Sequence, residues 1–199
     1  MSGGLVKRGF DIVCAALGQV LLAPTLLFAA VWVRLDSPGP VLFRQTRVGR
    51  FGKPFTIHKF RTMRVEPGAA ITVGEDPRIT RSGRFLRQTK LDELPQLWDV
   101  LRGVMSLVGP RPELPHYVAL YPADLRERVL AVRPGITDPA SLAFSREAEL
   151  LAAAADPERE YREVILPAKL RLSAEYAARA NLATDLRLIL ATLGRVVRG

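Results

Sequence analysis

The sequence contains one cysteine, Cys14, and two histidines, His58 and His116. A single cysteine excludes an intramolecular disulfide and a cysteine cluster for zinc. The two histidines lie far apart without the spacing of metal ligands, so histidine-based metal catalysis has no support. Cys14 stands in an apolar run, where a small buried hydrophobe is the default interpretation and acylation the weaker one. The chain also lacks internal repeats, low-complexity tracts and an evident domain linker.

Acidic residues are too few to balance the basic ones. The 199 residues carry a net charge of +9, with a pI near 10.4. The stretch from Arg34 to Arg111 alone contains 12 Arg and 3 Lys against 7 acids. Arg favours planar, bidentate binding of phosphate, so the bias indicates phosphate chemistry, although a generic basic surface facing a membrane would have the same composition. With 48% apolar and 25% charged residues, the chain fits neither a disordered nor a polytopic membrane protein.

The only long uncharged run is Ile12 to Val33. As one helix it would extend roughly 33 Å, enough for a hydrocarbon core of about 30 Å. Pro24 lies in the middle and breaks the helix into two arms of about 11 residues, neither of which reaches the far leaflet. Basic residues flank both ends, which the positive-inside rule places on one side. We therefore predict a re-entrant helix-break-helix, with a spanning helix kinked at Pro24 as the alternative.

A second apolar pattern lies near the C-terminus. It falls on one helical face that arginines accompany, which suits a helix in the plane of the membrane interface; packing against the protein core would produce the same pattern. The face consists of Leu182, Leu186, Ile189, Leu190, Leu193 and Val197.

The middle of the chain predicts mixed secondary structure. β-leaning runs at 41–48 and 55–60, separated by a Gly- and Pro-containing segment, predict a hairpin. A short strand is expected at 104–108, a turn at Pro134-Gly135, a polar loop from Glu66 to Pro77, and helices at 150–155 and 161–180. Leucines after position 91 recur with helical period, and Thr89-x-x-Asp92 matches a capping box.

Asp92-Glu93 is the candidate chemical centre. Adjacent carboxylates at a helix start usually serve as caps, which is the structural alternative. Here arginines and Lys90 precede them, and Arg111 follows between two prolines that would fix its backbone. A carboxylate that attacks a diphosphate must overcome a repulsion of about 1 kcal/mol per charge pair at 4 Å in water, or about 4 at a dielectric of 20. Arginines and a divalent cation such as Mg²⁺, which prefers carboxylate ligands, would reverse that balance.

Five short motifs occur in order: SPGPVLFRQ at 37–45, HKFRTM at 58–63, RQTKLDELPQL at 87–97, SLVGPRPE at 106–113 and RPGIT at 133–137. Together they resemble the bacterial sugar transferase family, the monotopic phosphoglycosyl transferases that start glycan assembly on undecaprenyl phosphate. The resemblance extends from about Lys7 to the C-terminal helix, and from it we expect a short form without the helices that precede the hairpin in larger members.

The resemblance implies a two-step reaction. Asp92 attacks the sugar-bearing phosphate of a UDP-sugar and releases UMP, and undecaprenyl phosphate then attacks the phosphosugar-aspartate. Glu93 matches the second residue of the dyad, with a role toward the incoming phosphate or toward Mg²⁺, for which Asp92 is the expected ligand. The resemblance also implies substrate or phosphate contacts for other motif residues, each of which could instead be a structural ion-pair partner. These residues are Lys59, Arg61, Arg87, Arg111 and Glu113.

The implied architecture is a helix-rich, monotopic α+β protein with one catalytic domain over residues 1–199. It comprises a membrane hairpin at 1–35, a catalytic core at 36–145 and a C-terminal helical region at 146–199 with an interfacial amphipathic helix. The implied location is the bacterial inner membrane, with the catalytic part on the cytoplasmic face and no nucleic acid as partner. The sugar, the pathway and the oligomeric state, homo-oligomers included, are left open.

Two positions depart from the family pattern. Many members have Ser before the helix-breaking proline, where this chain has Ala23, so a hydroxyl cannot satisfy the freed carbonyls there. After PGIT many members continue with Gly, whereas this chain reads DPASL at 138–142, which leaves the transferred sugar undetermined. A non-catalytic basic module that binds anionic lipid or a glycan-assembly partner is the rival interpretation, but it gives no reason for an acidic dyad among arginines. Nucleic-acid binding is disfavoured because no recognition motif is present.

Overall fold

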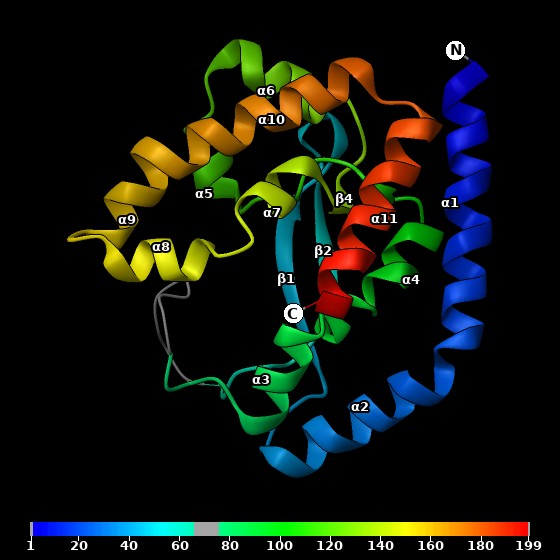
Figure 1. Ribbon diagram of the computed structural model, residues 1–199, viewed down its shortest axis with the longest axis vertical. Coiled ribbons are helices and arrows are strands. Elements are labelled where there is room, and N and C mark those ends of the chain that lie inside the picture. The colour runs from blue at the N-terminus through cyan, green and yellow to red at the C-terminus, as the bar shows by residue number, and fades with distance from the viewer. Residues whose placement is uncertain (1, 66–75, 199) are drawn as a thin grey trace.

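The structure is a computed structural model that describes residues 2–65 and 76–198. The fold combines many helices with two small β-sheets (Figure 1), which confirms the helix-rich α+β prediction. Most of the predicted loop from Glu66 to Pro77 lies outside the described residues. The helices are α1 (Ser2–Leu21), α2 (Ala23–Asp36), α3 (Arg81–Gln88), α4 (Gln96–Leu101), α5 (Pro115–Val118), α6 (Ala123–Leu130), α7 (Pro139–Ala143), α8 (Glu147–Ala153), α9 (Pro157–Glu160), α10 (Leu166–Arg179) and α11 (Leu182–Arg198).

The first sheet is the predicted hairpin. Strands β1 (Leu42–Val48) and β2 (Pro54–Phe60) pair antiparallel from Leu42 opposite Phe60 to Val48 opposite Pro54. The tip between them is a short 3₁₀ turn, Arg50–Gly52. Strands of seven residues bounded by Gly and Pro are what the β-leaning runs indicated, and both boundaries agree to within one residue.

The second sheet joins segments that are distant in sequence. Strands β3 (Ser106–Val108) and β4 (Gly135–Thr137) pair in parallel, so the predicted strand at 104–108 is confirmed in its second half. The predicted turn at Pro134-Gly135 is wrong for Gly135, which begins β4. A Cβ at Gly135 would lie 2.1 Å from the backbone nitrogen of Gly109, so only glycine permits this approach of the two chains.

Helices α1 and α2 form a bent pair at the N-terminus. Helix α2 begins at Ala23 with Pro24 in its first turn, where the missing N–H costs least. The two helices are bent by 63°, so the predicted break is present, but it falls at Leu22, one residue before Ala23-Pro24. Each helix also continues beyond the uncharged arms into polar residues. No single helix in the described ranges is long and apolar enough to cross a membrane, whereas the bent pair qualifies together by length and composition.

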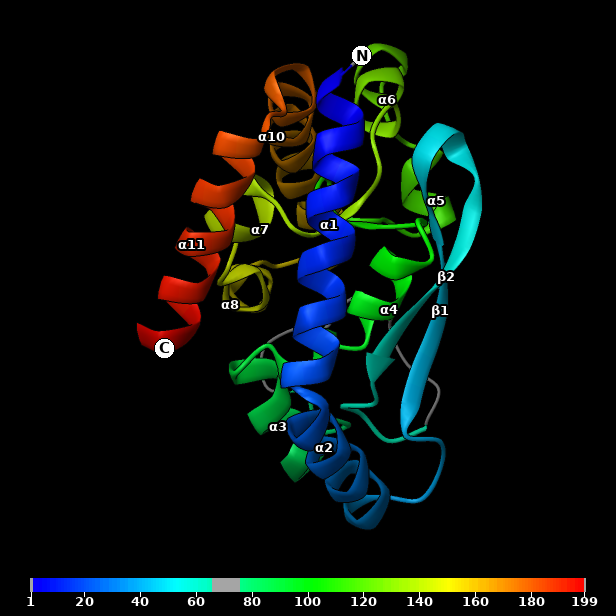
Figure 2. The same ribbon diagram turned by 90° about the vertical axis from the view of Figure 1, so that its right-hand side faces the viewer.

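Helix α1 docks on the protein through polar side chains. Figure 2 shows it running between α11 and α4. Lys7 pairs with the buried Asp185 of α11 at 2.5 Å, and Arg8 donates to two carbonyls at the C-terminus of α4 at 2.7 and 3.0 Å. Asp11, which is also buried, accepts a hydrogen bond from the backbone of β3 at 3.2 Å. The opposite side of α1 exposes apolar residues, among them Leu5, Val13 and Leu17.

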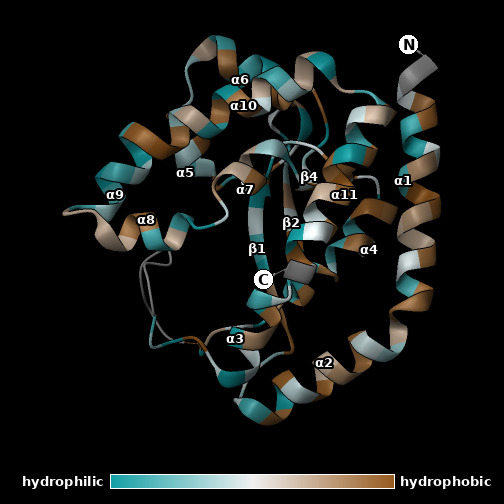
Figure 3. Ribbon diagram, viewed as in Figure 1, coloured by the Kyte–Doolittle hydropathy of each residue, from teal (hydrophilic) through white to brown (hydrophobic). Residues whose placement is uncertain are grey.

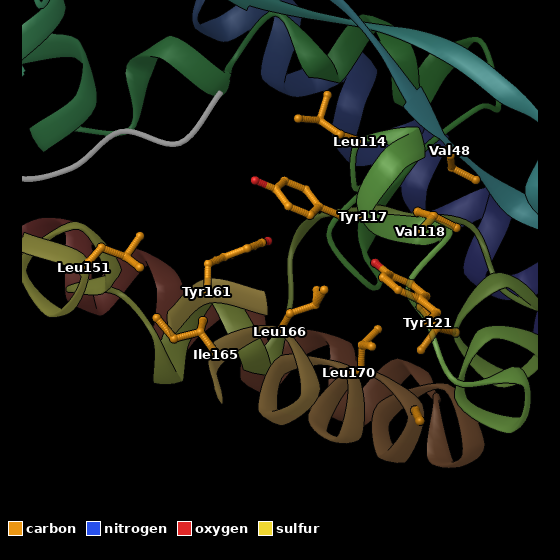
Figure 4. Close-up of a cluster of buried hydrophobic side chains, with 12 residues drawn as sticks. Val48, Leu114, Tyr117, Val118, Tyr121, Leu151, Tyr161, Ile165, Leu166 and Leu170 are labelled. Atoms are coloured by element: carbon orange, nitrogen blue, oxygen red, sulfur yellow. The ribbon is translucent and has the colours of Figure 1, made fainter. Parts of the chain in front are cut away.

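Three hydrophobic clusters hold the remaining elements together. The largest joins the C-terminal half of the chain to the end of β1 (Figure 4), with the rings of Tyr117 and Tyr161 4.8 Å apart. A second cluster packs α1 and β2 against α4. The third packs the inner face of α2 on α3 and β2 and reaches Leu91, the residue before Asp92. Helix α2 of the bent pair is therefore packed directly beside the candidate site.

Helix α11 turns its apolar stripe outward. Leu186, Leu190 and Leu193 are 43%, 67% and 57% exposed, so the core-packing alternative is wrong for these three residues. Among the described side chains of α11, only Asp185 is buried, and it is fully enclosed. Helix α2 is also mostly hydrophobic, up to its charged C-terminal end (Figure 3). The predicted helix at 161–180 is present as a π-helical turn, Tyr161–Ile165, followed by α10.

Candidate active site

The candidate dyad lies on a tight turn between two helices. Helix α3 begins at Thr80, whose side-chain oxygen accepts from the backbone of Gly83 at 3.0 Å. After α3, Lys90 adopts a left-handed conformation with φ 58°, and a 3₁₀ turn of Leu91–Glu93 follows. A left-handed non-glycine residue costs about 1–3 kcal/mol and is held only where its surroundings require it. Lys90 thus redirects the chain immediately before Asp92.

The predicted capping box at this turn is wrong. Thr89 ends α3 rather than starting the next helix, and its hydroxyl donates to the carbonyl of Phe85 at 2.8 Å. Asp92 and Glu93 therefore form their own short turn, ahead of α4. Since Thr89 caps neither of them, the simplest structural explanation of the acidic pair as a reciprocal cap does not apply.

Glu93 is the centre of an ion-pair cluster. Lys59 of β2 donates to its Oε1 at 2.7 Å, and Arg111, which follows β3, pairs with both carboxylate oxygens. Burial alone would raise the pKa of Glu93, but Arg111 and Lys59 together hold it well below the usual range. The same pairing raises the pKa of Arg111. Three segments far apart in sequence thus meet at one carboxylate that is ionised at neutral pH.

Asp92 is the opposite case. It is 9% exposed, and its Oδ1 is buried without a hydrogen-bond partner among the described residues. Burial, followed by the charge of Glu93, raises the pKa of Asp92 to about 6, against the lowering effect of Lys59, Lys90 and Arg87. At neutral pH most molecules therefore carry a poorly solvated carboxylate with an unused lone pair, which is the condition of an activated anionic nucleophile.

The backbone of Arg111 is fixed by a residue that sequence analysis missed as a contributor to the site. Asp138 is fully buried, and its Oδ2 accepts from the backbone nitrogen of Arg111 at 3.2 Å. Its Oδ1 accepts from Ser141 at 2.7 Å and caps α7. The signal was present as Asp-Pro-Ala-Ser, a helix-start pattern, but it was interpreted only as a departure from the family motif.

The other predicted contact residues divide into two groups. Lys59 and Arg111 meet the dyad directly, and Arg87 lies near enough to Asp92 to lower its pKa, while its Nε donates to Thr62 at 2.9 Å. Arg61 is buried and donates to Ser37 and Pro40 at 2.5–2.8 Å.

Glu113, like Arg61, makes its polar contacts within the fold. It accepts a hydrogen bond from Tyr161 at 2.7 Å and pairs with Arg47 at 3.5 Å. For both Arg61 and Glu113 the geometry favours the structural alternative over substrate contact.

The site fits only a sparse magnesium ligand set. In the two described ranges, no three His, Cys, Asp or Glu side chains come together as a metal site. Mg²⁺ commonly keeps several waters and takes one or two carboxylates plus substrate phosphates. The unpartnered Oδ1 of Asp92 suits one such position, whereas both oxygens of Glu93 already accept from cations.

Comparison with known proteins shows the family to which this sequence is similar. A family model described as bacterial sugar transferase matches residues 2–199. A UDP-glucose:undecaprenyl-phosphate glucose-1-phosphate transferase of Caulobacter vibrioides is 51% identical over 138 residues, which are 67% of this chain and 52% of that protein. The Escherichia coli K12 protein of the same description is 49% identical over 138 residues, 67% of this chain and 30% of that protein.

A third relative differs in the sugar that it names. A putative undecaprenyl-phosphate N-acetylgalactosaminyl 1-phosphate transferase of Bacillus subtilis is 41% identical over 123 residues, 60% of this chain and 69% of that protein. The chain spans about half of the Caulobacter protein and less than a third of the Escherichia coli protein.

Proposed function

The chain belongs to the bacterial sugar transferase family, and from this premise we propose that it transfers a sugar-1-phosphate from a UDP-sugar to undecaprenyl phosphate. The relatives described above carry names of this reaction class. Because those names include both glucose and N-acetylgalactosamine, the proposal covers the reaction and leaves the sugar open.

The buried, unpartnered Oδ1 of Asp92 is the observation that carries the proposed mechanism. In the first step this oxygen attacks the sugar-bearing phosphorus of the UDP-sugar. The bond from that phosphorus to the bridging oxygen breaks, and the electron pair leaves with UMP. In the second step an oxygen of undecaprenyl phosphate attacks the same phosphorus, which displaces the Asp92 carboxylate and yields undecaprenyl diphosphate sugar.

Glu93 serves this chemistry as a fixed negative charge. A carboxylate held ionised by Lys59 and Arg111 is a poor general base, because its pKa lies far below neutral. It instead holds two cations beside Asp92, where they offset the repulsion between an anionic nucleophile and an anionic diphosphate. Lys59 and Arg111 are the groups placed to bind the transferring phosphate.

Mg²⁺ is proposed as the cofactor, with Asp92 as its single protein ligand from the dyad. When bound, the ion neutralises diphosphate charge. Mg²⁺ prefers carboxylate ligands, and the Asp92 carboxylate has a second oxygen besides the attacking Oδ1, which supports this assignment. The protein's own part is to keep Asp92 desolvated and to keep Lys59 and Arg111 oriented.

We propose further that the bent pair of α1 and α2 enters the cytoplasmic leaflet of the bacterial inner membrane and returns, so that the protein is monotopic. The 63° bend and the basic residues on both flanks support this topology. Single cysteines at Ser2 and Asp36, introduced in the Cys14→Ser background, test it by labelling from one side. Reaction of both from the cytoplasmic side agrees with re-entry, and reaction from opposite sides means a spanning pair.

The test of the reaction itself is UMP release. The protein is incubated with Mg²⁺, undecaprenyl phosphate and a panel of UDP-sugars, and Asp92→Asn is the matched variant. We expect UMP from one or a few sugars with the wild type and none with Asp92→Asn, which retains its fold by circular dichroism. Full release by the variant would overturn the nucleophile assignment.

A further inference from the structure

An aromatic cluster lies on the outside of α2 and α3, next to the catalytic turn. The rings of Phe28 and Trp32 are 5.8 Å apart, and those of Trp32 and Phe85 are 5.3 Å apart. Phe28 is 63% and Phe85 is 42% exposed. We call these three residues together with Arg84 the α2–α3 patch.

The cluster faces outward because the inner sides of both helices are already used. Ala29 and Val33 of α2 pack with Leu86 of α3 in the third hydrophobic cluster. Figure 1 shows α2 and α3 side by side at the lower end of the molecule. Exposed aromatic rings of this kind need an apolar contact, which water does not provide.

Arg84 gives the patch a positive end. It precedes Phe85 on the exposed side of α3, and among the described residues its guanidinium has no hydrogen-bond or ion-pair partner. An arginine without an internal partner beside exposed rings matches a ligand with one anionic end and one apolar end. The patch is therefore complementary in both charge and hydropathy to a lipid phosphate.

Helix α3 connects this patch to the nucleophile. Arg87 follows Arg84 by three residues, so the two side chains are neighbours on the helix surface. Arg87 acts electrostatically on Asp92. Arg84 and Arg87 thus place two positive charges along α3 between the patch and Asp92.

We infer that the α2–α3 patch is the docking site of the lipid acceptor, with Arg84 binding the phosphate of undecaprenyl phosphate and Phe28, Trp32 and Phe85 contacting its isoprene chain. This inference rests on the proposed function. It assigns the acceptor to the α2–α3 side and leaves Lys59 and Arg111 to the phosphate that is transferred.

The experiment separates the two half-reactions. Exchange of labelled UMP into the UDP-sugar needs no acceptor and reports the first step, whereas product formation against varied undecaprenyl phosphate reports the second. For Arg84→Gln we expect the KM for undecaprenyl phosphate to rise about tenfold, the loss of one charge-assisted contact, while UMP exchange keeps its rate. Phe85→Leu should raise the same KM about threefold.

Matched controls remove the same groups elsewhere on the surface. Arg126 is exposed on α6, and Phe51 is exposed at the hairpin tip. Arg126→Gln and Phe51→Leu should leave the KM for undecaprenyl phosphate unchanged. An equal rise in the controls, an unchanged KM in Arg84→Gln, or loss of UMP exchange in Arg84→Gln would each overturn the assignment.

A further measurement distinguishes the acceptor from bulk anionic lipid. The KM is determined in micelles of a neutral detergent as well as in vesicles that contain phosphatidylglycerol. A rise that persists in neutral micelles supports an acceptor site, and one that disappears there means that the patch binds bulk headgroups. Should wild-type protein exchange no UMP with any UDP-sugar, the proposed function itself fails, which is distinct from all outcomes above.

Discussion

The backbone nitrogen of Arg111 donates a hydrogen bond to the buried carboxylate of Asp138 at 3.2 Å. Through Arg111 this contact reaches Glu93, and through its other oxygen Asp138 caps α7. One aspartate therefore connects the start of α7 to Arg111, the cation that pairs with Glu93 of the candidate dyad.

Asp138→Asn should damage both stability and rate. An asparagine keeps one accepting oxygen, so either Arg111 or the first turn of α7 loses its partner. We expect the free energy of unfolding to fall by about 1–2 kcal/mol and UMP release to slow about tenfold, measured by thermal unfolding and by steady-state assay at a temperature where the variant is folded. Asp156→Asn, at the cap of the exposed α9, is the control and should leave the rate unchanged. Wild-type values for Asp138→Asn would contradict the positioning role.

Asp92→Asn should make the protein more stable at pH 7.5. The pKa of Asp92 is raised in the folded state to about 6 from the ordinary 3.8, so folding favours the neutral form, and stability is lost as the pH rises through about 6. Removing the charge should return on the order of 1 kcal/mol at pH 7.5 and nothing below pH about 4. Glu93→Gln serves as the opposite control, because it leaves Lys59 and Arg111 without their anion and should destabilise by about 3 kcal/mol. Equal loss of stability in both variants would show that the Asp92 charge carries no strain.

The pH dependence of the reaction should report the same carboxyl group. A protonated Asp92 cannot attack phosphorus, so kcat/KM for the UDP-sugar should fall about tenfold for each pH unit below about 6 and level off above it. Initial rates of UMP release between pH 5 and 8 measure this, with circular dichroism at each pH to confirm folding. A flat profile down to pH 5 would mean that the group titrating near 6 is not the nucleophile.

Arg61→Lys distinguishes a structural arginine from a substrate ligand. A lysine cannot reproduce the several donors that Arg61 directs at Ser37 and Pro40. We expect the free energy of unfolding to fall by about 2 kcal/mol while the KM for the UDP-sugar stays the same. Arg34→Lys, which removes a single exposed contact to Gly39, should cost much less. A raised KM at unchanged stability would restore Arg61 as a substrate contact.

The features that could be predicted from the sequence are those set by neighbouring residues. The hairpin follows from two β-leaning runs around Gly49, and the helix break follows from Pro24, because both depend on local backbone preferences. Strand β4 was missed because its three residues gain their structure only by pairing with β3. The short α3 is rich in arginine and contains Gly83, so it has too few apolar residues to be predicted as a core-packed helix.

In the candidate site, too, local motifs predict the residues, whereas their charge states depend on contacts between distant segments. Asp92 and Glu93 were found by their motif, but the different charge states of the two follow from which of them meets Lys59 and Arg111. Those contacts join three segments and leave no local pattern. Asp138 shows the limit most clearly, since a helix-capping sequence was visible while its hydrogen bond to Arg111 depends on the parallel pairing of β3 and β4.

The ion pair and hydrogen bonds that attach α1 to the rest of the protein limit how its apolar surface could be reduced by engineering. Deleting this helix would remove Lys7 from the enclosed Asp185 and Arg8 from the end of α4, so the truncated product would carry an unpaired buried charge and an uncapped helix. A workable design would keep the docking side of α1 and replace only its outward residues, such as Leu5, Val13 and Leu17, with polar ones. The outward apolar surface can be redesigned there, whereas the helix beneath it has to stay.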